Sequence, residues 1–208
     1  MSAVLPGGVK VCGITSVADA LACAGLGVDA LGLNFWPGTP RCITPELARE
    51  VADALGGRVE LVAVFVNAPT EEIRRVREIT TIHWVQLHGA ETPDDVAALL
   101  PGAYKAVGVA DAADVTAALA FPGEELLLDA RVPGAMPGGT GHTFEWDLAI
   151  EVAKHRRLVL AGGLHAGNVA EAVARVRPWR VDVASGVEHA PGKKDLAKVE
   201  AFVRAAKG

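Results

Sequence analysis

The stretch Val9-Lys10-Val11-Cys12-Gly13-Ile14-Thr15 decides how the rest of the chain is organised. It is typical of a parallel strand buried on both faces, and Ser16 and Asp19 then signal a helix start. Cys12 lies where the strand ends, and Gly13 lets the backbone pass close to a neighbouring group. Parallel barrels carry their chemistry at the C-terminal ends of their strands, so Cys12 is a candidate catalytic thiol. A small buried hydrophobe is the commoner role of a free cysteine, and only the rest of the chain favours the first interpretation.

Short apolar runs recur along the chain, with helical stretches between them. The predicted strands begin near Val9, Ala30, Glu60, His83, Tyr104, Glu125, Arg157 and Arg180. Successive starts are 21 to 32 residues apart, which leaves room for a strand, two short loops and a helix. Eight such units without a break in composition predict an α/β fold, a single-domain (β/α)8 TIM barrel over residues 1–208.

Three threonines are predicted to begin helices. Thr44 precedes Pro45, and Thr92 precedes Pro93, which is the usual order of an N-cap and a first helical residue. Thr70 stands before two glutamates and is expected to act in the same way.

Charge and cysteine content limit the classes of function. The chain has 20 Lys and Arg against 25 Asp and Glu, a formal net charge of -5, and no basic stretch. These features argue against nucleic acid or an anionic membrane as a partner. The three cysteines, Cys12, Cys23 and Cys42, form no CxxC pair, so neither a disulfide framework nor a zinc site is expected. With no signal peptide and no membrane-spanning run, we expect a reducing cytoplasm.

Two loops are longer than the others, and both follow strands, so both are expected at the catalytic end of the barrel. The first covers residues 34–41 and the second residues 131–143. Arg41 is the only cation of the first loop; it is either a solvated charge or a fork that grips a carboxylate. Asp129 ends an apolar strand, where it either caps the loop or pairs with Arg131, or acts in catalysis.

The turns after the last two predicted strands favour phosphate binding. Gly162-Gly163 follows the seventh strand and Ser185-Gly186 follows the eighth. Such turns expose backbone N–H groups near a helix N-terminus, although glycines also serve simply to make tight turns. Gln86 and His88 end the fourth strand, where His88 is either a general base or a side chain that only lines the pocket. The histidines show no metal-ligand spacing, and no metal is predicted.

An ordered set of motifs resembles the phosphoribosylanthranilate isomerase family of tryptophan biosynthesis. The resemblance runs from residue 10 to residue 202. Glu145 stands where an Asp is common in the family, and Gly38-Thr39 where a serine is common. The matching motifs are Lys10–Thr15, Pro40-Arg41, Val64–Val66, Val85–Gly89, Leu127–Asp129, Gly138–Gly141, Phe144–Trp146, Ala161–Leu164, Asn168-Val169, Ser185–Glu188 and Pro191–Asp195.

The resemblance implies an Amadori rearrangement of a phosphorylated small molecule, N-(5'-phosphoribosyl)anthranilate. Asp129 would be the general acid that protonates the ring oxygen, and Cys12 the general base that removes the proton from sugar C2. Arg41 would bind the anthranilate carboxylate. The Schiff-base nitrogen is itself the electron sink, so no metal and no organic cofactor is expected.

Two other interpretations remain open from the sequence. A metal-dependent pentose-phosphate epimerase would share the phosphate turns, but it needs paired His and Asp ligands at strand ends. A barrel that binds phosphate esters without catalysis is the alternative outside the enzymes. The sequence also leaves open whether the chain is a monomer or a homodimer.

Overall fold

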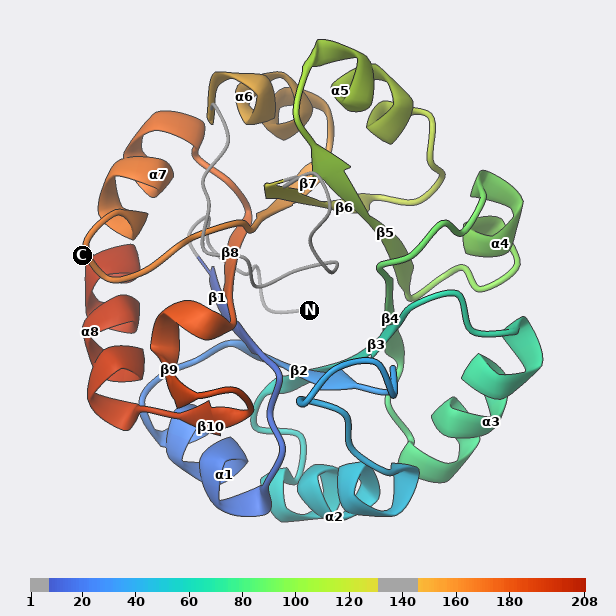
Figure 1. The fold of residues 1–208 in the computed structure, drawn as a ribbon, viewed down its shortest axis with the longest axis vertical. Coiled ribbons are helices and arrows are strands. Elements are labelled where there is room, and N and C mark those ends of the chain that lie inside the picture. The colour runs from blue at the N-terminus through green and yellow to red at the C-terminus, as the bar shows by residue number, and fades with distance from the viewer. Residues whose placement is uncertain (1–7, 131–145) are drawn as a thin grey trace.

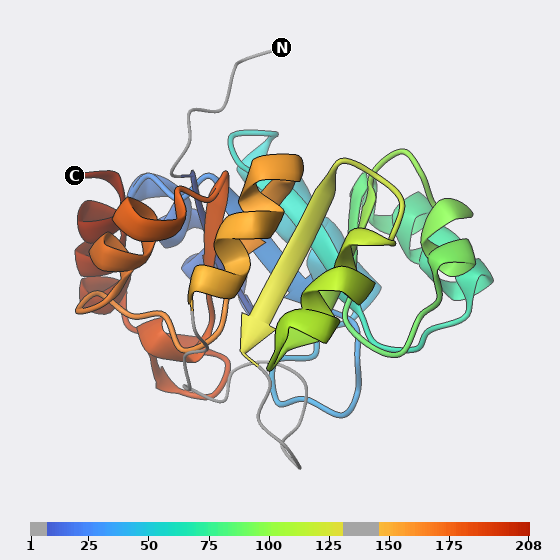
Figure 2. The same ribbon diagram turned by 90° about the horizontal axis from the view of Figure 1, so that it is seen from above.

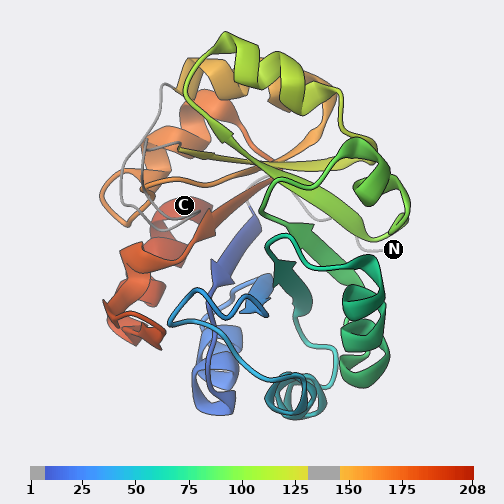
Figure 3. The same ribbon diagram turned by 45° about the vertical axis from the view of Figure 1, so that its right-hand side comes forward.

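Eight parallel strands form a closed barrel in chain order, surrounded by helices (Figures 1 and 3). The computed structural model describes residues 8–130 and 146–208. The barrel closes because the first strand pairs with the last, with Lys10 opposite Asp182 in the register. The strands are β1 (Gly8–Cys12), β2 (Ala30–Asn34), β3 (Glu60–Phe65), β4 (Trp84–Leu87), β5 (Ala103–Val109), β6 (Glu125–Ala130), β7 (Arg157–Leu160) and β8 (Arg180–Val183).

The helices lie outside the barrel, and a short hairpin follows the last barrel strand. The helices are α1 (Val17–Gly25), α2 (Pro45–Leu55), α3 (Thr70–Thr80), α4 (Pro93–Ala97), α5 (Ala112–Leu119), α6 (Trp146–His155), α7 (Val169–Val176) and α8 (Leu196–Lys207). A 3-10 turn, η1 (Ser185–Val187), leads into the hairpin of β9 (Glu188–Ala190) and β10 (Lys193–Lys194). Figure 2 shows loop 34–41 and this hairpin at the end of the barrel toward which the strand arrows point. The predicted second loop, residues 131–143, and Glu145 lie outside the described residues.

The predicted barrel is confirmed, and every predicted strand start lies within one residue of the observed start. Two of the three threonine caps are also confirmed. Thr44 accepts a hydrogen bond from the Leu47 amide, and Thr92 forms a capping box with Asp95. The third was wrong, because α3 already contains Thr70 and its N-cap is Pro69. Proline is extended there (φ -59°, ψ 142°), and its carbonyl accepts the first helical hydrogen bonds.

Side chains alternate along each strand between the helices and the barrel interior, as the pleat requires. The larger apolar cluster lies between the strands and the helices. The interior cluster is smaller: Val62, Tyr104, Ala106, Leu127, Val159 and Ala161. Buried polar groups also lie in the interior: Lys10 donates hydrogen bonds to both Gln86 and Asp182 across the barrel. The interior therefore combines a small apolar cluster with a buried polar network.

Candidate active site

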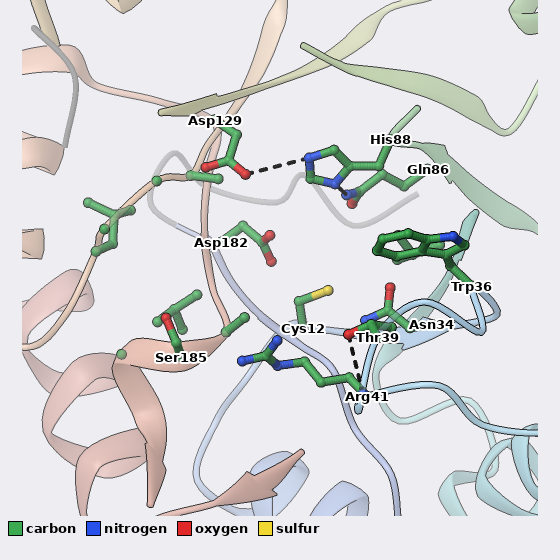
Figure 4. Close-up of a pocket in the computed structure, with 18 of the residues that line it drawn as sticks. Cys12, Asn34, Trp36, Thr39, Arg41, Gln86, His88, Asp129, Asp182 and Ser185 are labelled. Carbon is green, nitrogen blue, oxygen red and sulfur yellow. Dashed lines mark hydrogen bonds and ion pairs between the residues drawn. The ribbon is translucent and has the colours of Figure 1, made fainter. Parts of the chain in front are cut away.

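The nine residues singled out from the sequence line one pocket at the C-terminal end of the barrel (Figure 4). They are Cys12, Arg41, Gln86, His88, Asp129, Gly162, Gly163, Ser185 and Gly186. Four further polar or aromatic residues of the lining were missed: Asn34, Trp36, Thr39 and Asp182. Asp182 could have been found by counting along β8, because it faces inward two residues before the turn that carries Ser185.

Cys12 is buried at the end of β1, with 8% of its surface exposed. Burial raises the pKa of its thiol, and the nearby Asp182 carboxylate adds to the rise. Three cations, Lys10, Lys194 and Arg41, act in the opposite direction without cancelling it. The raised pKa keeps the thiol protonated near neutral pH, while the three cations favour its ionised form once it loses the proton.

Arg41 is not a solvated loop charge. Its guanidinium makes two parallel hydrogen bonds to Glu188, Nε to Oε1 at 2.9 Å and Nη2 to Oε2 at 2.7 Å. Its side chain also passes against Gly13, which has φ +79° and has no room for a Cβ, since that atom would lie 2.5 Å from Arg41 Cδ. The close neighbour expected at Gly13 is thus this side chain. The pairing with Glu188 leaves Nη1 as the part of the fork with no partner in the described structure.

Glu188 joins the β9–β10 hairpin to the site. Besides Arg41, its Oε1 accepts hydrogen bonds from Lys194 Nζ at 2.9 Å and from the Gly192 amide at 3.2 Å. Lys194 also donates to the Cys12 carbonyl at 2.6 Å. The sequence places Glu188 only within a motif and does not indicate its role, because its partner Arg41 lies 147 residues away in the chain.

His88 lies between Gln86 and Asp129 (Figure 4). Its Nδ1 is 3.0 Å from Gln86 Nε2, and its Nε2 is 3.5 Å from Asp129 Oδ2. Asp129 is 6% exposed, lies one residue before the end of β6 and lines the pocket. In the view of Figure 4, Asp182 lies between Asp129 and Cys12, so the proposed acid and base face the pocket from different sides.

A buried polar network supports the floor of the pocket. Lys10 is fully buried and donates to Asp182 Oδ1 at 2.8 Å and to Gln86 Oε1 at 3.0 Å. Tyr104 donates its hydroxyl to the same Gln86 oxygen at 3.0 Å. Burial, the largest single effect, lowers the pKa of Lys10, but Asp182, Cys12 and Tyr104 together outweigh it and raise the pKa, so the ammonium stays charged.

The two predicted phosphate turns lie side by side. A Cβ on Gly186 would collide with the carbonyl oxygen of Leu164, so only glycine allows the turns to pack this closely. Asn168, just before α7, holds the first turn: its Nδ2 donates to the Gly163 carbonyl at 3.0 Å, and its Oδ1 accepts from the His165 amide at 2.8 Å. Backbone groups of both turns therefore face the same end of the pocket.

No cluster of three or more His, Cys, Asp or Glu side chains among the described residues could hold a metal ion. No helix in that part of the chain is long and apolar enough to cross a membrane.

A closed barrel with a thiol, carboxylates and a cation at the C-terminal ends of its strands defines a (β/α)8-barrel enzyme. The profile of the family described as N-(5'-phosphoribosyl)anthranilate (PRA) isomerase matches residues 9–205. The chain belongs to this family.

Relatives and solved structures agree with this assignment. An N-(5'-phosphoribosyl)anthranilate isomerase of Pelobacter propionicus is 43% identical over 199 residues, covering 96% of this chain and 95% of the relative. A phosphoribosyl anthranilate isomerase in complex with reduced 1-(o-carboxyphenylamino)-1-deoxyribulose 5-phosphate has a TM-score of 0.86 at 39% identity, with 97% and 98% of the two chains covered. Monomers of a dimeric isomerase from Thermotoga maritima have a TM-score of 0.85 at 39% identity and the same coverage.

Proposed function

We propose that this protein isomerises N-(5'-phosphoribosyl)anthranilate to 1-(2-carboxyphenylamino)-1-deoxyribulose 5-phosphate, a step of tryptophan biosynthesis, with Asp129 as acid and Cys12 as base. The observation that carries the proposal is that one pocket receives Cys12 from β1 and Asp129 from β6. These strands are not neighbours in the barrel, so the two groups reach different atoms of one sugar.

The chemistry requires two proton transfers. Asp129 donates a proton to the furanose ring oxygen, and the C1–O bond breaks to give a Schiff base between C1 and the anthranilate nitrogen. Cys12, as thiolate, then removes the proton from C2, and the electron pair moves through C1 to that nitrogen to give an enolamine. Tautomerisation of the enolamine produces the ketone. Each acid or base contributes roughly 10²- to 10⁴-fold to the rate.

The substrate's two anionic ends match two parts of the pocket. We place the phosphate against the turns at Gly162-Gly163 and Ser185-Gly186, where backbone N–H groups can donate to it. We place the anthranilate carboxylate at Nη1 of Arg41, because Glu188 already occupies the Nε–Nη2 edge. Glu188 thereby holds the guanidinium in one orientation before the substrate arrives.

The setting of the reaction is part of the proposal. The three cysteines are free thiols, which suits a reducing cytoplasm. A homodimer is the proposed assembly on the strength of the dimeric Thermotoga maritima relative.

The test is an assay in which the unstable substrate is made in the cuvette and its disappearance is followed in the presence of a metal chelator. Cys12→Ser and Asp129→Asn should each lower kcat by at least about 100-fold and leave product binding nearly intact. Cys42→Ser, the same change at a half-buried thiol outside the pocket lining, is the matched control and should keep normal turnover. A Cys12→Ser enzyme with near-normal kcat would exclude Cys12 as the base. Product binding without turnover by the unaltered protein would instead support a non-catalytic barrel.

A further inference from the structure

We infer that the amide of Gln86 holds His88 as the tautomer with its proton on Nε2, so that His88 is a positioning residue for Asp129 and not a base. The role of Asp129 as the acid rests on the proposed function, whereas the tautomer of His88 follows from the hydrogen bonds alone. The inference follows from the hydrogen bonds of three buried groups on β1, β4 and β5.

Lys10 and Tyr104 fix the orientation of the Gln86 amide. Its Oε1 receives Lys10 Nζ at 3.0 Å and the Tyr104 hydroxyl at 3.0 Å. An ammonium group can only donate, so the atom that faces Lys10 must be the amide oxygen. If the amide were reversed, its NH2 group would face the charged ammonium in a buried site. Lys10 therefore fixes which end of the amide faces His88.

The Gln86 amide in turn determines which nitrogen of the His88 ring carries the proton. Because its oxygen faces Lys10, its nitrogen Nε2 faces His88 Nδ1 at 3.0 Å. The amide nitrogen is a donor only, so Nδ1 must accept and cannot carry a proton. In a neutral imidazole the proton is then on Nε2. This nitrogen faces Asp129 Oδ2 at 3.5 Å.

These contacts prevent His88 from acting as a base and let it position Asp129. Both ring nitrogens of His88 are engaged, one by Gln86 and the other by Asp129, so neither has a free lone pair to take a proton from the sugar. The Nε2–H group faces Asp129 Oδ2 from 3.5 Å, and this contact orients the Asp129 carboxyl group at the edge of the pocket. Lys10, whose charge is balanced by Asp182 at 2.8 Å, thus acts on Asp129 through two intermediate side chains.

The tautomer can be read without turnover from the ¹⁵N NMR spectrum of the histidine rings, recorded at pH 8, above the ordinary titration range of histidine. The protein has six histidines, and the signals missing from a His88→Gln sample identify those of His88. We expect the pattern of an Nε2–H ring. In Gln86→Glu both side-chain oxygens can only accept, so the proton should move to Nδ1. A wild-type spectrum with the proton on Nδ1 overturns the inference.

Kinetics then separate positioning from base catalysis. His88→Gln keeps an N–H donor that can reach Asp129 and should lower kcat only several-fold. His88→Ala removes the donor and should lower kcat by about 10-fold or more, because the Asp129 carboxyl group loses the contact that positions it. Equal losses in the two variants, each shown to bind product, would mean that the ring does more than donate and would overturn the positioning role. If the unaltered protein fails to turn the substrate over, the proposed function fails while the NMR result still decides the tautomer.

Discussion

Glu125 is a buried carboxyl group at the end of the barrel opposite the pocket, and it makes the stability of the fold depend on pH. It begins β6 with 3% of its surface exposed. Within the described residues, its Oε2 atom has no hydrogen-bond partner. The nearby Arg180 is engaged with Glu60, Nη1 to Oε1 at 2.6 Å. Burial therefore dominates and raises the pKa of Glu125 to about 7, with Arg180 opposing the rise and Glu60 adding to it.

The sign and size of the effect follow from this pKa. An unfolded glutamate titrates near 4.5, so between that pH and about 7 the folded state binds more protons than the unfolded state. The free energy of unfolding must then fall as the pH rises through this window. At about 1.4 kcal/mol for each pKa unit, ionisation of Glu125 should cost roughly 2.5 kcal/mol between pH 5 and pH 8.

The test is Glu125→Gln, which keeps the shape of the side chain and removes its titration. Urea unfolding at pH 5, 6, 7 and 8 gives the difference in free energy of unfolding between the variant and the wild type. This difference should grow by roughly 2.5 kcal/mol in favour of the variant as the pH rises. Glu124→Gln removes the same charge from an exposed neighbour (side chain 78% exposed) and should change by less than about 0.5 kcal/mol. A Glu125→Gln difference that stays constant across these pH values would refute the reasoning.

Three further predictions concern the pocket. Because the pKa of the Cys12 thiol is raised, the ultraviolet absorbance of its thiolate, taken as the difference between the wild type and Cys12→Ser, should appear only above pH 9; thiolate absorbance already present at pH 7 would contradict this assignment. Gly13→Ala should lower the free energy of unfolding by about 1–2 kcal/mol in urea and raise KM, because its Cβ displaces Arg41. Gly57→Ala is the control: Gly57 also has a positive φ (+78°), but its Cβ would meet no other atom, so this variant should keep a normal KM. Arg41→Ala should raise KM for the natural substrate about 10-fold or more while inorganic phosphate still binds, and an equal loss of both would contradict the carboxylate assignment.

Local sequence was enough to predict the barrel and the position of the pocket. Strand starts follow from short apolar runs at regular spacing, and Thr44 and Thr92 begin helices by bonding to amides three residues ahead. Cys12 and Asp129 could be found because each directly ends an apolar run, and parallel strands in a barrel all end at the same face. These signals lie within a few residues of the group they describe, so the sequence by itself determines them.

Only the tertiary structure decided the partners of the charged groups. Lys10 reaches Asp182, 172 residues along the chain, because barrel closure sets β1 against β8 in one register. It reaches Gln86, 76 residues along, because the closed barrel brings β4 across the interior from β1. The sequence left open whether Arg41 is exposed to solvent or binds a ligand. In the structure its side chain pairs with Glu188, 147 residues away. The sequence gives the charge of each side chain, but the opposite charge that pairs with it depends on which distant strands and loops lie next to each other in the fold.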